Sequence, residues 1–534
     1  MHFILRSLLL LIALFLTGIN ALRAQKEIEI LSGERAQGSK NKNIMTISEN
    51  VVIRHNGVFI QCDSAIRKIN EGIVEGFGHI HIYQPDTFTL TGGDYLKYTE
   101  STKTAIVTGK QVVLSDQQMT LLTTSIQYNT ASQVGFYTNG ADILNDKNTL
   151  KSRRGYYNRR GNVFNFKDDV LLTSPDYTME SDTLDYYAST KTAYFYGPTR
   201  IVSEENTILC SYGWYNTQTE MAEFSRNATI ISKSNTISAD SLFYDKKAGI
   251  GRGMGNLKMT DSAEQVEVYG QNGIHYQKTD ETMISGKPVA ARMEEDDTMY
   301  VMADSFYFKN DSLKKSLKAF YHTSILQKDF QGKCDSLLYN FSDSSISLYH
   351  GPVLWNERNQ ITGDTMHIQM KRKRIHSLTV LDRAFLASEV KPGSFNQISG
   401  KTMVNSFDTS NKLRQVLVDG NAEIVYYIRN NESDTAEYTG VNKERCGRLL
   451  ILLDSNKVSG IRHYGQPEGK IYPLREFPES EKYLTELDWK IEEKPRLESF
   501  LERKKPRVIV TSAPVKSAPG KKSKTSRKAR KKVK

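Results

Sequence analysis

Cysteine is scarce in this chain, with 4 among 534 residues. Cys62, Cys210, Cys334 and Cys446 lie far apart and form no Cys-x-x-Cys pair, which excludes the common zinc and thioredoxin signatures. Cys62 and Cys334 each stand directly before an aspartate, at the same place in a repeated sequence. We therefore expect small buried side chains there rather than a disulfide framework.

Long apolar runs are also missing, except near the start. Residues 1–6 are weakly basic and residues 7–16 form an apolar run that is too short to span a bilayer comfortably. This pattern predicts a signal peptide over residues 1–24, cleaved after Ala24, and an exported mature chain. No cysteine follows the run, so a lipoprotein is not expected, and no later segment is long enough to predict a membrane span.

The chain lacks the usual catalytic motifs, since neither Gly-x-Ser-x-Gly nor His-Glu-x-x-His occurs. Residues 33–40 come close to a phosphate-binding loop, but Ser39 precedes Lys40 instead of following it. His79 and His81 could share one strand face, yet no third metal ligand is evident, and residues 294–297 are interpreted as a solvated acidic surface. We predict no active site, no cofactor and no metal centre.

Positive charge is confined to the C-terminal end. Residues 503–534 contain 14 Lys or Arg and no acidic residue, and removing these charges from the net charge of +11 leaves −3 on residues 1–502. The composition of this segment predicts a disordered basic tail. In an exported protein its candidate partners are anionic lipid headgroups or phosphorylated glycans rather than nucleic acid, and a tail with no specific partner is equally open.

What the chain does contain is a repeat of about 30 residues. Its anchor is an aspartate after a small residue, followed by apolar and aromatic residues, and the spacings 63 to 94, 304 to 335 and 335 to 364 are 31, 31 and 29 residues. The anchors are Asp63, Asp94, Asp182, Asp240, Asp304, Asp335 and Asp364. A fixed period of this length predicts stacked units that share one core, and the aspartate is interpreted as a turn-ordering residue.

Each repeat favours strands, because Val, Ile, Thr, Tyr and Phe alternate with polar residues. Apolar pairs two residues apart point to the same side of a strand and are predicted to line one apolar wall. The candidate lining residues are Ile80, Ile82, Val112, Leu114, Val170, Leu172, Leu257 and Met259. Core packing alone would explain the same residues. The alternating glycines 249, 251, 253 and 255 indicate either close backbone approach or room for a ligand chain.

The predicted organisation follows from changes in this pattern. Regular repeats occupy residues 25–394, and an atypical terminal β block, residues 395–477, caps the stack. Residues 478–502 change to helical spacing, with Leu484, Leu487 and Ile491 on one face, and are expected to cover a sheet edge.

These repeats resemble the organic-solvent-tolerance (OstA-like) family, which contains the periplasmic lipopolysaccharide-transport protein A and the N-terminal domain of its outer-membrane assembly partner. The anchor at residues 239–244, the following Ala and Gly, and the short strand at 257–259 carry the resemblance, which extends over about 50–430 and looks like the large Bacteroidetes-type members. It implies an all-β, elongated, twisted open β-jellyroll whose apolar groove shields lipid A acyl chains between the inner and outer membranes. It also implies a periplasmic location, with outer-membrane association left open.

The partners implied by the resemblance are lipopolysaccharide, an inner-membrane export complex, the outer-membrane assembly protein, and other copies joined edge to edge. This chain is much longer than the small bridge protein, and past Leu453 it has too few alternating strands for the partner's barrel. Two alternatives stay open. One is an exported structural or adhesive scaffold with a solid core, and the other is a parallel β-helix enzyme acting on polysaccharide.

Overall fold

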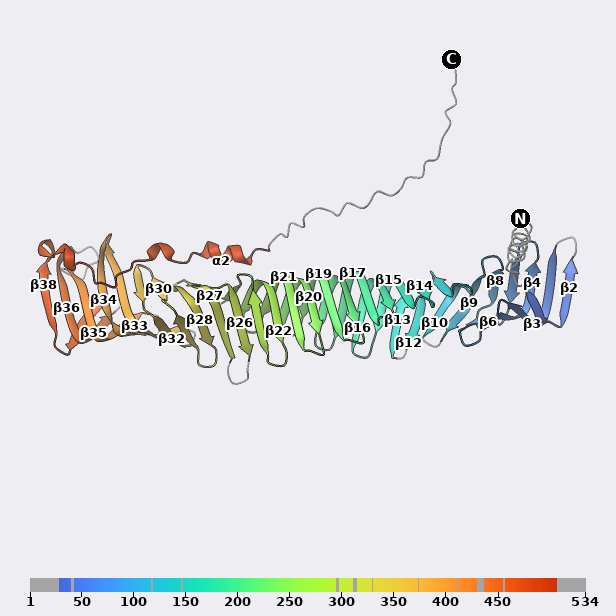
Figure 1. Ribbon diagram of the computed structural model, residues 1–534, viewed down its shortest axis with the longest axis horizontal. Helices are drawn as coiled ribbons and strands as arrows, with labels where there is room; N and C mark the ends of the chain where they lie inside the picture. The colour runs from blue at the N-terminus through green and yellow to red at the C-terminus, as the bar shows by residue number, and fades with distance from the viewer. Residues whose placement is uncertain are drawn as a thin grey trace, which may run out of the picture.

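The computed structural model describes residues 28–506, apart from 40–42, 117–118, 146, 294–296, 311–314, 329, 373, 411, 430–436 and 455–456. The described residues form one long rod of β-strands with a short helix, α2 (Leu497–Lys504), along its flank (Figure 1). The expected elongated all-β architecture is confirmed. The predicted signal peptide and residues 507–534 of the predicted tail lie outside the described residues.

The strands follow one another along the rod in chain order, and every pairing in the described part is antiparallel. The N-terminal strands are β1 (Glu29–Ser32), β2 (Arg35–Ser39), β3 (Ile44–His55), β4 (Val58–Lys68), β5 (Ile73–Phe77), β6 (His81–Gln84), β7 (Phe88–Gly92), β8 (Tyr95–Thr99), β9 (Thr104–Ser115), β10 (Thr120–Asn129), β11 (Val134–Tyr137), β12 (Ala141–Asn145), β13 (Asn148–Ser152) and β14 (Arg154–Asn158). The antiparallel pairing differs from that of a parallel β-helix.

The middle of the rod is built from long hairpins. Its strands are β15 (Val163–Thr173), β16 (Tyr177–Tyr187), β17 (Thr192–Ser203), β18 (Thr207–Asn216), β19 (Met221–Ile231), β20 (Asn235–Asp245), β21 (Ile250–Asp261), β22 (Val266–Tyr276), β23 (Glu281–Ser285), β24 (Val289–Met293), β25 (Thr298–Met302) and β26 (Ser305–Asn310). The strands β15–β22, with 10–12 residues each, match the 30-residue repeat because one repeat supplies two of them, whereas β23–β26 are shorter halves of 5 or 6 residues.

The C-terminal strands continue the same stack and become longer. They are β27 (Lys315–Gln327), β28 (Phe330–Asn340), β29 (Ser345–Tyr349), β30 (Val353–Asn356), β31 (Asn359–Thr362), β32 (Thr365–Lys371), β33 (Arg374–Lys391), β34 (Ser394–Phe407), β35 (Leu413–Arg429), β36 (Tyr438–Asp454), β37 (Lys457–Tyr464) and β38 (Glu468–Pro473). The strand pairing crosses residue 394 without a break, since β33, β34 and β35 are neighbours.

Each long strand bends near its middle. In β15 the register shifts between Lys167 and Val170, where Asp168 and Asp169 have φ of 63° and 53°. Arg226 and Asn227 make the same bend in β19, with φ of 60° and 63°. A residue pair in the left-handed region turns the strand sharply, as a bulge does. Shorter strands such as β5 and β6 are the two halves of one such pass, interrupted at the bend.

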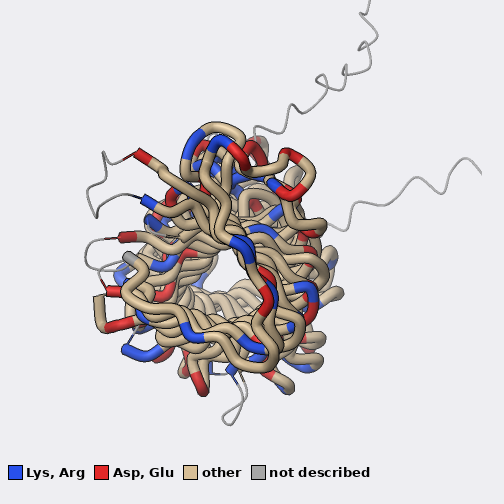
Figure 2. The backbone as a smooth tube through the Cα atoms, turned by 90° about the vertical axis from the view of Figure 1, so that its left-hand side faces the viewer, with Lys and Arg blue, Asp and Glu red and all other residues tan. Residues whose placement is uncertain are grey.

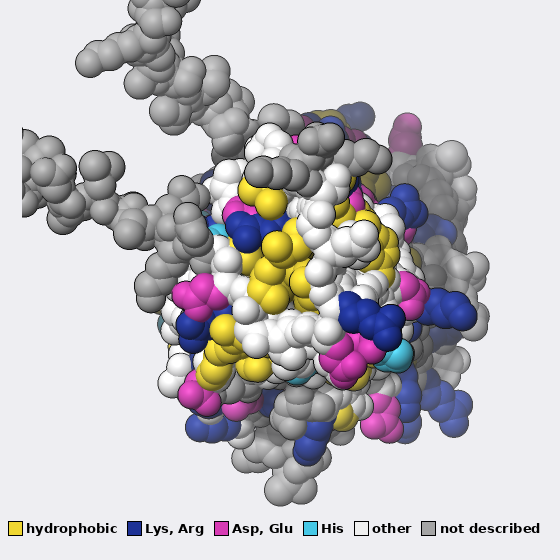
Figure 3. Space-filling view, turned by 90° about the vertical axis from the view of Figure 1, so that its right-hand side faces the viewer, with side chains coloured by type: hydrophobic (Ala, Val, Ile, Leu, Met, Phe, Trp, Pro, Cys, Tyr) yellow, Lys and Arg dark blue, Asp and Glu magenta, His cyan; other side chains and the backbone are white. Residues whose placement is uncertain are grey.

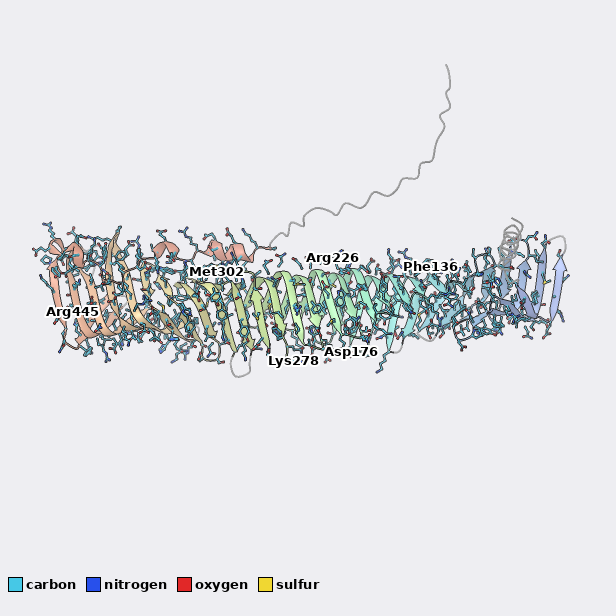
Figure 4. The ribbon with its side chains drawn as sticks, in the orientation of Figure 1. Phe136, Asp176, Arg226, Lys278, Met302 and Arg445 are labelled. Carbon is cyan, nitrogen blue, oxygen red and sulfur yellow. The ribbon has the colours of Figure 1, made fainter. Side chains whose placement is uncertain are left out.

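The bend gives the rod two walls. The bend divides each long strand into two halves. The halves that line up with residues 170–173 of β15 form wall A, and the halves that line up with residues 163–167 form wall B. Arg226, at a bend, lies on one long side of the rod, whereas the hairpin residues Asp176, from wall A, and Lys278, from wall B, both lie on the opposite side (Figure 4). We call that side, where the hairpins of both walls face each other, the mouth. Seen along the rod, the walls curve around a common interior (Figure 2).

Residues 474–505 double back along the rod and are called the strap (Figure 1). The strap contains three 3-10 turns, η1 (Leu474–Glu476), η2 (Glu479–Glu481) and η3 (Ile491–Glu493), before α2. The helical spacing of Leu484, Leu487 and Ile491 therefore does not produce an α-helix there, and the α-helix begins only after Pro495.

The reason for this difference is tertiary contact. Leu484 is buried against the outer face of wall A, and its backbone N–H donates to the Gln397 side chain at 2.8 Å. Because the Leu484 N–H donates to a side chain of the sheet, it is not available for the backbone hydrogen bond of an α-helix. Contact with the sheet therefore outweighs the helical spacing of the apolar residues. The strap also covers the face of a wall rather than the expected sheet edge. No helix in the described part is long and apolar enough to cross a bilayer.

Candidate functional site

The interior side of wall A carries an unbroken apolar row, which we call the A ladder. Its members are cross-strand partners in successive strands, so they stack along the rod. The A ladder consists of Ile53, Ile60, Ile82, Leu90, Leu114, Leu121, Ile143, Leu150, Leu172, Met179, Ile201, Ile208, Ile230, Ile237, Met259, Val268, Ala290, Val301, Ile325, Gly332, Leu354, Ile361, Leu386, Ile398 and Ile424. No charged residue interrupts it.

The facing row on wall B, the B ladder, alternates large aromatic and small residues through much of its length. It runs through Tyr98, Ala105, Tyr128, Gly135, Tyr157, Phe164, Tyr186, Ala193, Tyr215, Ala222, Tyr244, Gly251, His275, Thr282, Phe308, Leu317, Tyr339, Ile346 and Ile368. The tyrosines are those of the repeat, and the small residues beside them leave room for the rings.

Both ladders are buried toward the N-terminal end of the rod and less buried in its middle, and at the C-terminal end most members are buried again, although Tyr339 and Ile361 are half-buried. On wall A the exposed fraction is 0% at Ile82 and again at Ile325, whereas Leu172, Ile208, Ile230, Ile237, Met259 and Ala290 are half-buried. On wall B it is 1% at Tyr98 and 2% at Ile346, whereas Tyr186, Tyr215, Tyr244, Gly251, His275, Thr282 and Phe308 are half-buried. Single buried residues such as Met179 interrupt this region. We call β15–β26 the open stretch.

Side chains seal the mouth on the N-terminal side of the open stretch. Tyr157, from wall B, donates its hydroxyl proton to Asp116, from a wall A hairpin, and Arg159 Nε lies 3.7 Å from the same carboxylate. The Asp116 side chain is 2% exposed. Burial, and next the hydrogen bond to Asp116, raise the pKa of Tyr157 above its ordinary value.

Two further contacts cross the mouth closer to the N-terminus. The rings of Phe88 and Tyr128 lie 4.5 Å apart, and His55 Nδ1 lies 2.6 Å from Tyr98 Oη. Burial raises the pKa of Tyr98 to about 12. These contacts fill the interior with the protein's own side chains, so the N-terminal third has a solid core.

The open stretch has free space beside its glycines. Gly251 belongs to the B ladder, and a Cβ atom added there would meet no atom within 4 Å. At Gly253 the added atom would come within 2.7 Å of Leu257, so this glycine is needed for close packing. Of the two hypotheses for the alternating glycines, close approach therefore fits Gly253, and spare room fits Gly251.

The comparison with known families follows this geometry. Residues 26–182 and 178–240 match the family described as OstA-like protein. Across that part the chain is similar to OstA-like proteins. No curated protein matches the chain.

Two solved structures align with this chain at a TM-score of 0.10 each. LptH, the LptA homologous periplasmic component of the lipopolysaccharide transport device from Pseudomonas aeruginosa, has 10% identity and covers 39% of this chain and 95% of its own. The WD40 domain of SCAP from fission yeast has 9% identity and covers 78% of this chain and 95% of its own. Alignments with so low a TM-score carry no argument about fold or function.

The residues predicted to line the apolar wall differ in their surroundings. Ile80, Ile82, Val112 and Leu114 are at most 1% exposed and belong to the solid N-terminal core. Val170 and Leu257 lie beside bends in the open stretch and are 2% and 3% exposed. Leu172 and Met259 are A ladder members of the open stretch and are half-buried.

Sequence reasoning did not assign the B ladder to the lining. The signal was present, because a tyrosine recurs at one place in most repeats and a small residue follows it. Pairing these tyrosines with the A ladder requires knowing that each strand bends, which brings two halves of one strand face to face.

The anchor aspartates of the OstA-like repeats lie at the bends rather than in the hairpins. Asp63 lies 2.8 Å from Nδ1 of His79, which is in the bend between β5 and β6, and Asp304 lies 2.8 Å from His322 Nδ1. The aspartates therefore order the bends and not the hairpin turns. His79 has the Asp63 carboxylate as a hydrogen-bond partner within the fold. No group of three or more His, Cys, Asp or Glu side chains placed to hold a metal occurs among the described residues.

A surface recess of about 750 Å³ lies outside the interior. It follows the bends of β15–β19 and is lined in part by Glu180, Arg200 and Leu209, which point outward from wall A. Its charged, shallow surface does not continue the ladders. The ladders and the open stretch, rather than this recess, are the candidate site.

Proposed function

We propose that this chain is a periplasmic carrier in lipopolysaccharide transport that shields lipid A acyl chains between its two walls on their way from the inner to the outer membrane. The OstA-like match supports the class of protein. The observation that carries the proposal is the open stretch, where two facing apolar ladders are reachable from the mouth. The proposed role is that of a carrier rather than an enzyme.

The ladders suit an acyl chain because burial of each CH₂ group contributes about 0.8 kcal/mol. Successive strands lie about 4.8 Å apart, so a hydrocarbon chain lying along the rod meets equivalent apolar positions at every step. A chain can then slide between neighbouring positions without a deep trap. The direction of transport must come from partners at the membranes.

The tyrosines of the open stretch suit the boundary between acyl chains and sugar head. Tyr186, Tyr215 and Tyr244 are half-buried on the mouth side of wall B. A tyrosine offers an apolar ring to hydrocarbon and a hydroxyl to a polar headgroup. We therefore place the acyl chains between the ladders and the sugar at the mouth.

The ends of the rod suit edge-to-edge contact with partners or with further copies. At the N-terminal end, β1 and β2 pair with β3 alone among the described strands, and hydrophobic side chains gather at the centre of this end face (Figure 3). Ile30 and Leu31 there are 38% and 48% exposed. At the other end, β37 and β38 pair only with β36. Unpaired strand edges accept another strand readily. The proposed partners are the inner-membrane export complex and the outer-membrane assembly protein.

Photo-crosslinking in cells tests the proposal. A crosslinking amino acid at Ile237 or Met259, in the open stretch, should capture lipopolysaccharide, while the same group at Ile82 or Leu114, in the solid core, should capture much less. Depletion of the protein should leave lipopolysaccharide at the inner membrane. Well-folded protein that captures no lipid at any of these positions would favour the scaffold alternative, for which the solid N-terminal third is the supporting observation.

A further inference from the structure

A second recess, about 330 Å³, lies in the mouth at the C-terminal end of the open stretch. It joins the two walls, because β27 runs from Lys315 on the wall B side to Gln327 on the wall A side. It is lined by Glu264, Arg292, Met299, Lys315, Gln327, Tyr339, Phe341, Ser342, Ser344, Ile346 and Met370. The recess therefore has access both to solvent and to the interior.

Two cations face each other across this recess. Arg292 lies two residues from Ala290 of the A ladder, and Lys315 lies two residues from Leu317 of the B ladder. Residues two apart in a strand share a face, so both side chains stand one step closer to the mouth than the ladders. The lining also includes two apolar residues, Met299 beside Arg292 on the neighbouring strand and Ile346 of the B ladder.

The contacts of these cations leave charge available for an anion. Arg292 Nη1 donates to Tyr339 Oη at 3.2 Å, and Lys315 Nζ lies 5.8 Å from the centre of the Phe341 ring. Within the part of the chain that the structure describes, neither forms an ion pair with a carboxylate. Glu264 also lines the recess but does not neutralise both. An anion between Arg292 and Lys315 would accept charge-assisted hydrogen bonds from both walls.

We propose that this recess binds a phosphate monoester on the sugar head of the lipid whose acyl chains lie in the open stretch. This inference rests on the proposed function. A phosphate has enough oxygen atoms to accept hydrogen bonds from Arg292 on one wall and from Lys315 on the other. The planar guanidinium group of Arg292 also matches the geometry of two phosphate oxygens. The apolar part of the lining leads into the ladders, so one amphiphile can occupy both.

Binding of purified lipids to the full-length protein tests the assignment. The probes are a bis-phosphorylated lipid A, the same lipid without phosphate, and inorganic phosphate alone. The wild-type protein should bind the phosphorylated lipid about tenfold more tightly than the lipid without phosphate. The double variant Arg292→Gln and Lys315→Gln should lose this preference and keep its affinity for the lipid without phosphate. The matched control is Lys110→Gln and Arg226→Gln, which removes the same charge at the bends and should change neither affinity.

Each other outcome has a definite meaning. Equal affinity of the wild-type protein for both lipids, or a control variant that loses the preference as fully, overturns the recess assignment and leaves the carrier function standing. Inorganic phosphate that competes as strongly as the lipid would make the recess a site for free anions. Failure of the folded wild-type protein to bind either lipid would contradict the carrier function itself.

Discussion

At the scale of single residues, the repeated aspartate and the glycine of the next strand form one structural unit. Gly255 has φ of +73°, and a Cβ atom there would lie 2.2 Å from an Asp240 carboxylate oxygen. Asp240 in turn accepts hydrogen bonds from Asn256 Nδ2 at 3.1 and 3.3 Å. The aspartate thus braces a left-handed bend that the glycine makes possible, which explains why the two residues recur together.

Replacing the bend glycine tests this account. We expect Gly255→Ala to lower the free energy of unfolding by about 1–3 kcal/mol, because alanine is strained at this φ and collides with Asp240. Gly251→Ala is the matched control in the same strand and should be neutral or slightly stabilising, since its added methyl meets no atom within 4 Å. Urea unfolding followed by circular dichroism measures both. Equal losses in the two variants would contradict the account.

The buried tyrosines predict a loss of stability at alkaline pH. Burial raises the pKa values of Tyr98, Tyr137 and Tyr177 to about 12, from an ordinary value of 10.0. The folded chain holds these protons more tightly than the unfolded chain, so their contribution is complete below pH 10 and is lost as the pH rises from 10 to 12. Denaturation midpoints measured across this range should fall.

A phenylalanine variant isolates the tyrosine contribution from that of other groups. Tyr177→Phe removes one ionisation and keeps the ring, so the denaturation midpoint should fall less steeply above pH 10 than in the wild-type chain. An identical slope in the two proteins would assign the alkaline loss to groups other than Tyr177.

At the scale of elements, the strap is held by two glutamines that act alike. Gln397 Nε2 donates to the Lys482 carbonyl at 2.8 Å while its Oε1 accepts from the Leu484 amide at 2.8 Å. Gln360 does the same with the Asp488 carbonyl and the Lys490 amide, both at 2.7 Å. Each side chain therefore pairs with strap backbone as a neighbouring strand would, and satisfies polar groups that burial would otherwise leave unpaired.

Removing one glutamine should loosen the strap. Gln397→Ala leaves buried strap groups without partners, which we expect to cost about 1–3 kcal/mol and to speed hydrogen exchange at residues 482–490. Gln218→Ala, in an exposed hairpin, is the control and should leave exchange unchanged. Unaltered exchange in Gln397→Ala would mean that apolar packing alone fixes the strap.

Local pattern in the sequence was enough to predict the repeats, the strands and the inward direction of apolar pairs such as Val170 and Leu172. The bends were not predictable in the same way, because Asp168 and Asp169 adopt left-handed conformations without a glycine. The seal depends on Asp116 meeting Tyr157, 41 residues away, and the strap depends on contacts with Gln397. Such features arise from pairing between distant residues, which periodicity does not encode.

At the scale of the whole molecule, the interior differs along the rod although the repeat continues. In a stack, each unit contacts mainly its neighbours, so one region can be solid while another is open. Asp116 stands at the change between the two, since the ladders are sealed on its N-terminal side and become half-buried from Leu172 onward. A few side-chain contacts across the mouth therefore determine how much of the interior is open.

Thiol labelling tests this control without any lipid. A maleimide should react quickly with Ile237→Cys, in the open stretch, and slowly with Leu121→Cys, which is 2% exposed in the wild-type chain. Adding Asp116→Ala to Leu121→Cys should raise its rate about tenfold, because Tyr157 and Arg159 lose their buried partner. The four native cysteines are buried and give the background rate. A rate unchanged by Asp116→Ala would show that packing, not the carboxylate, closes this part.

The backward course of the strap has a practical consequence for anyone who labels this molecule. Lys504 contacts Glu267 of β22, and Arg503 donates to the Ala303 carbonyl, so the polypeptide leaves the body at its flank, far from the tip formed by β38. A fluorescent protein fused directly after Pro506 would be tethered beside β22. Both tips would stay clear for assembly assays, whereas a fusion directly before Ile28 would crowd one of them.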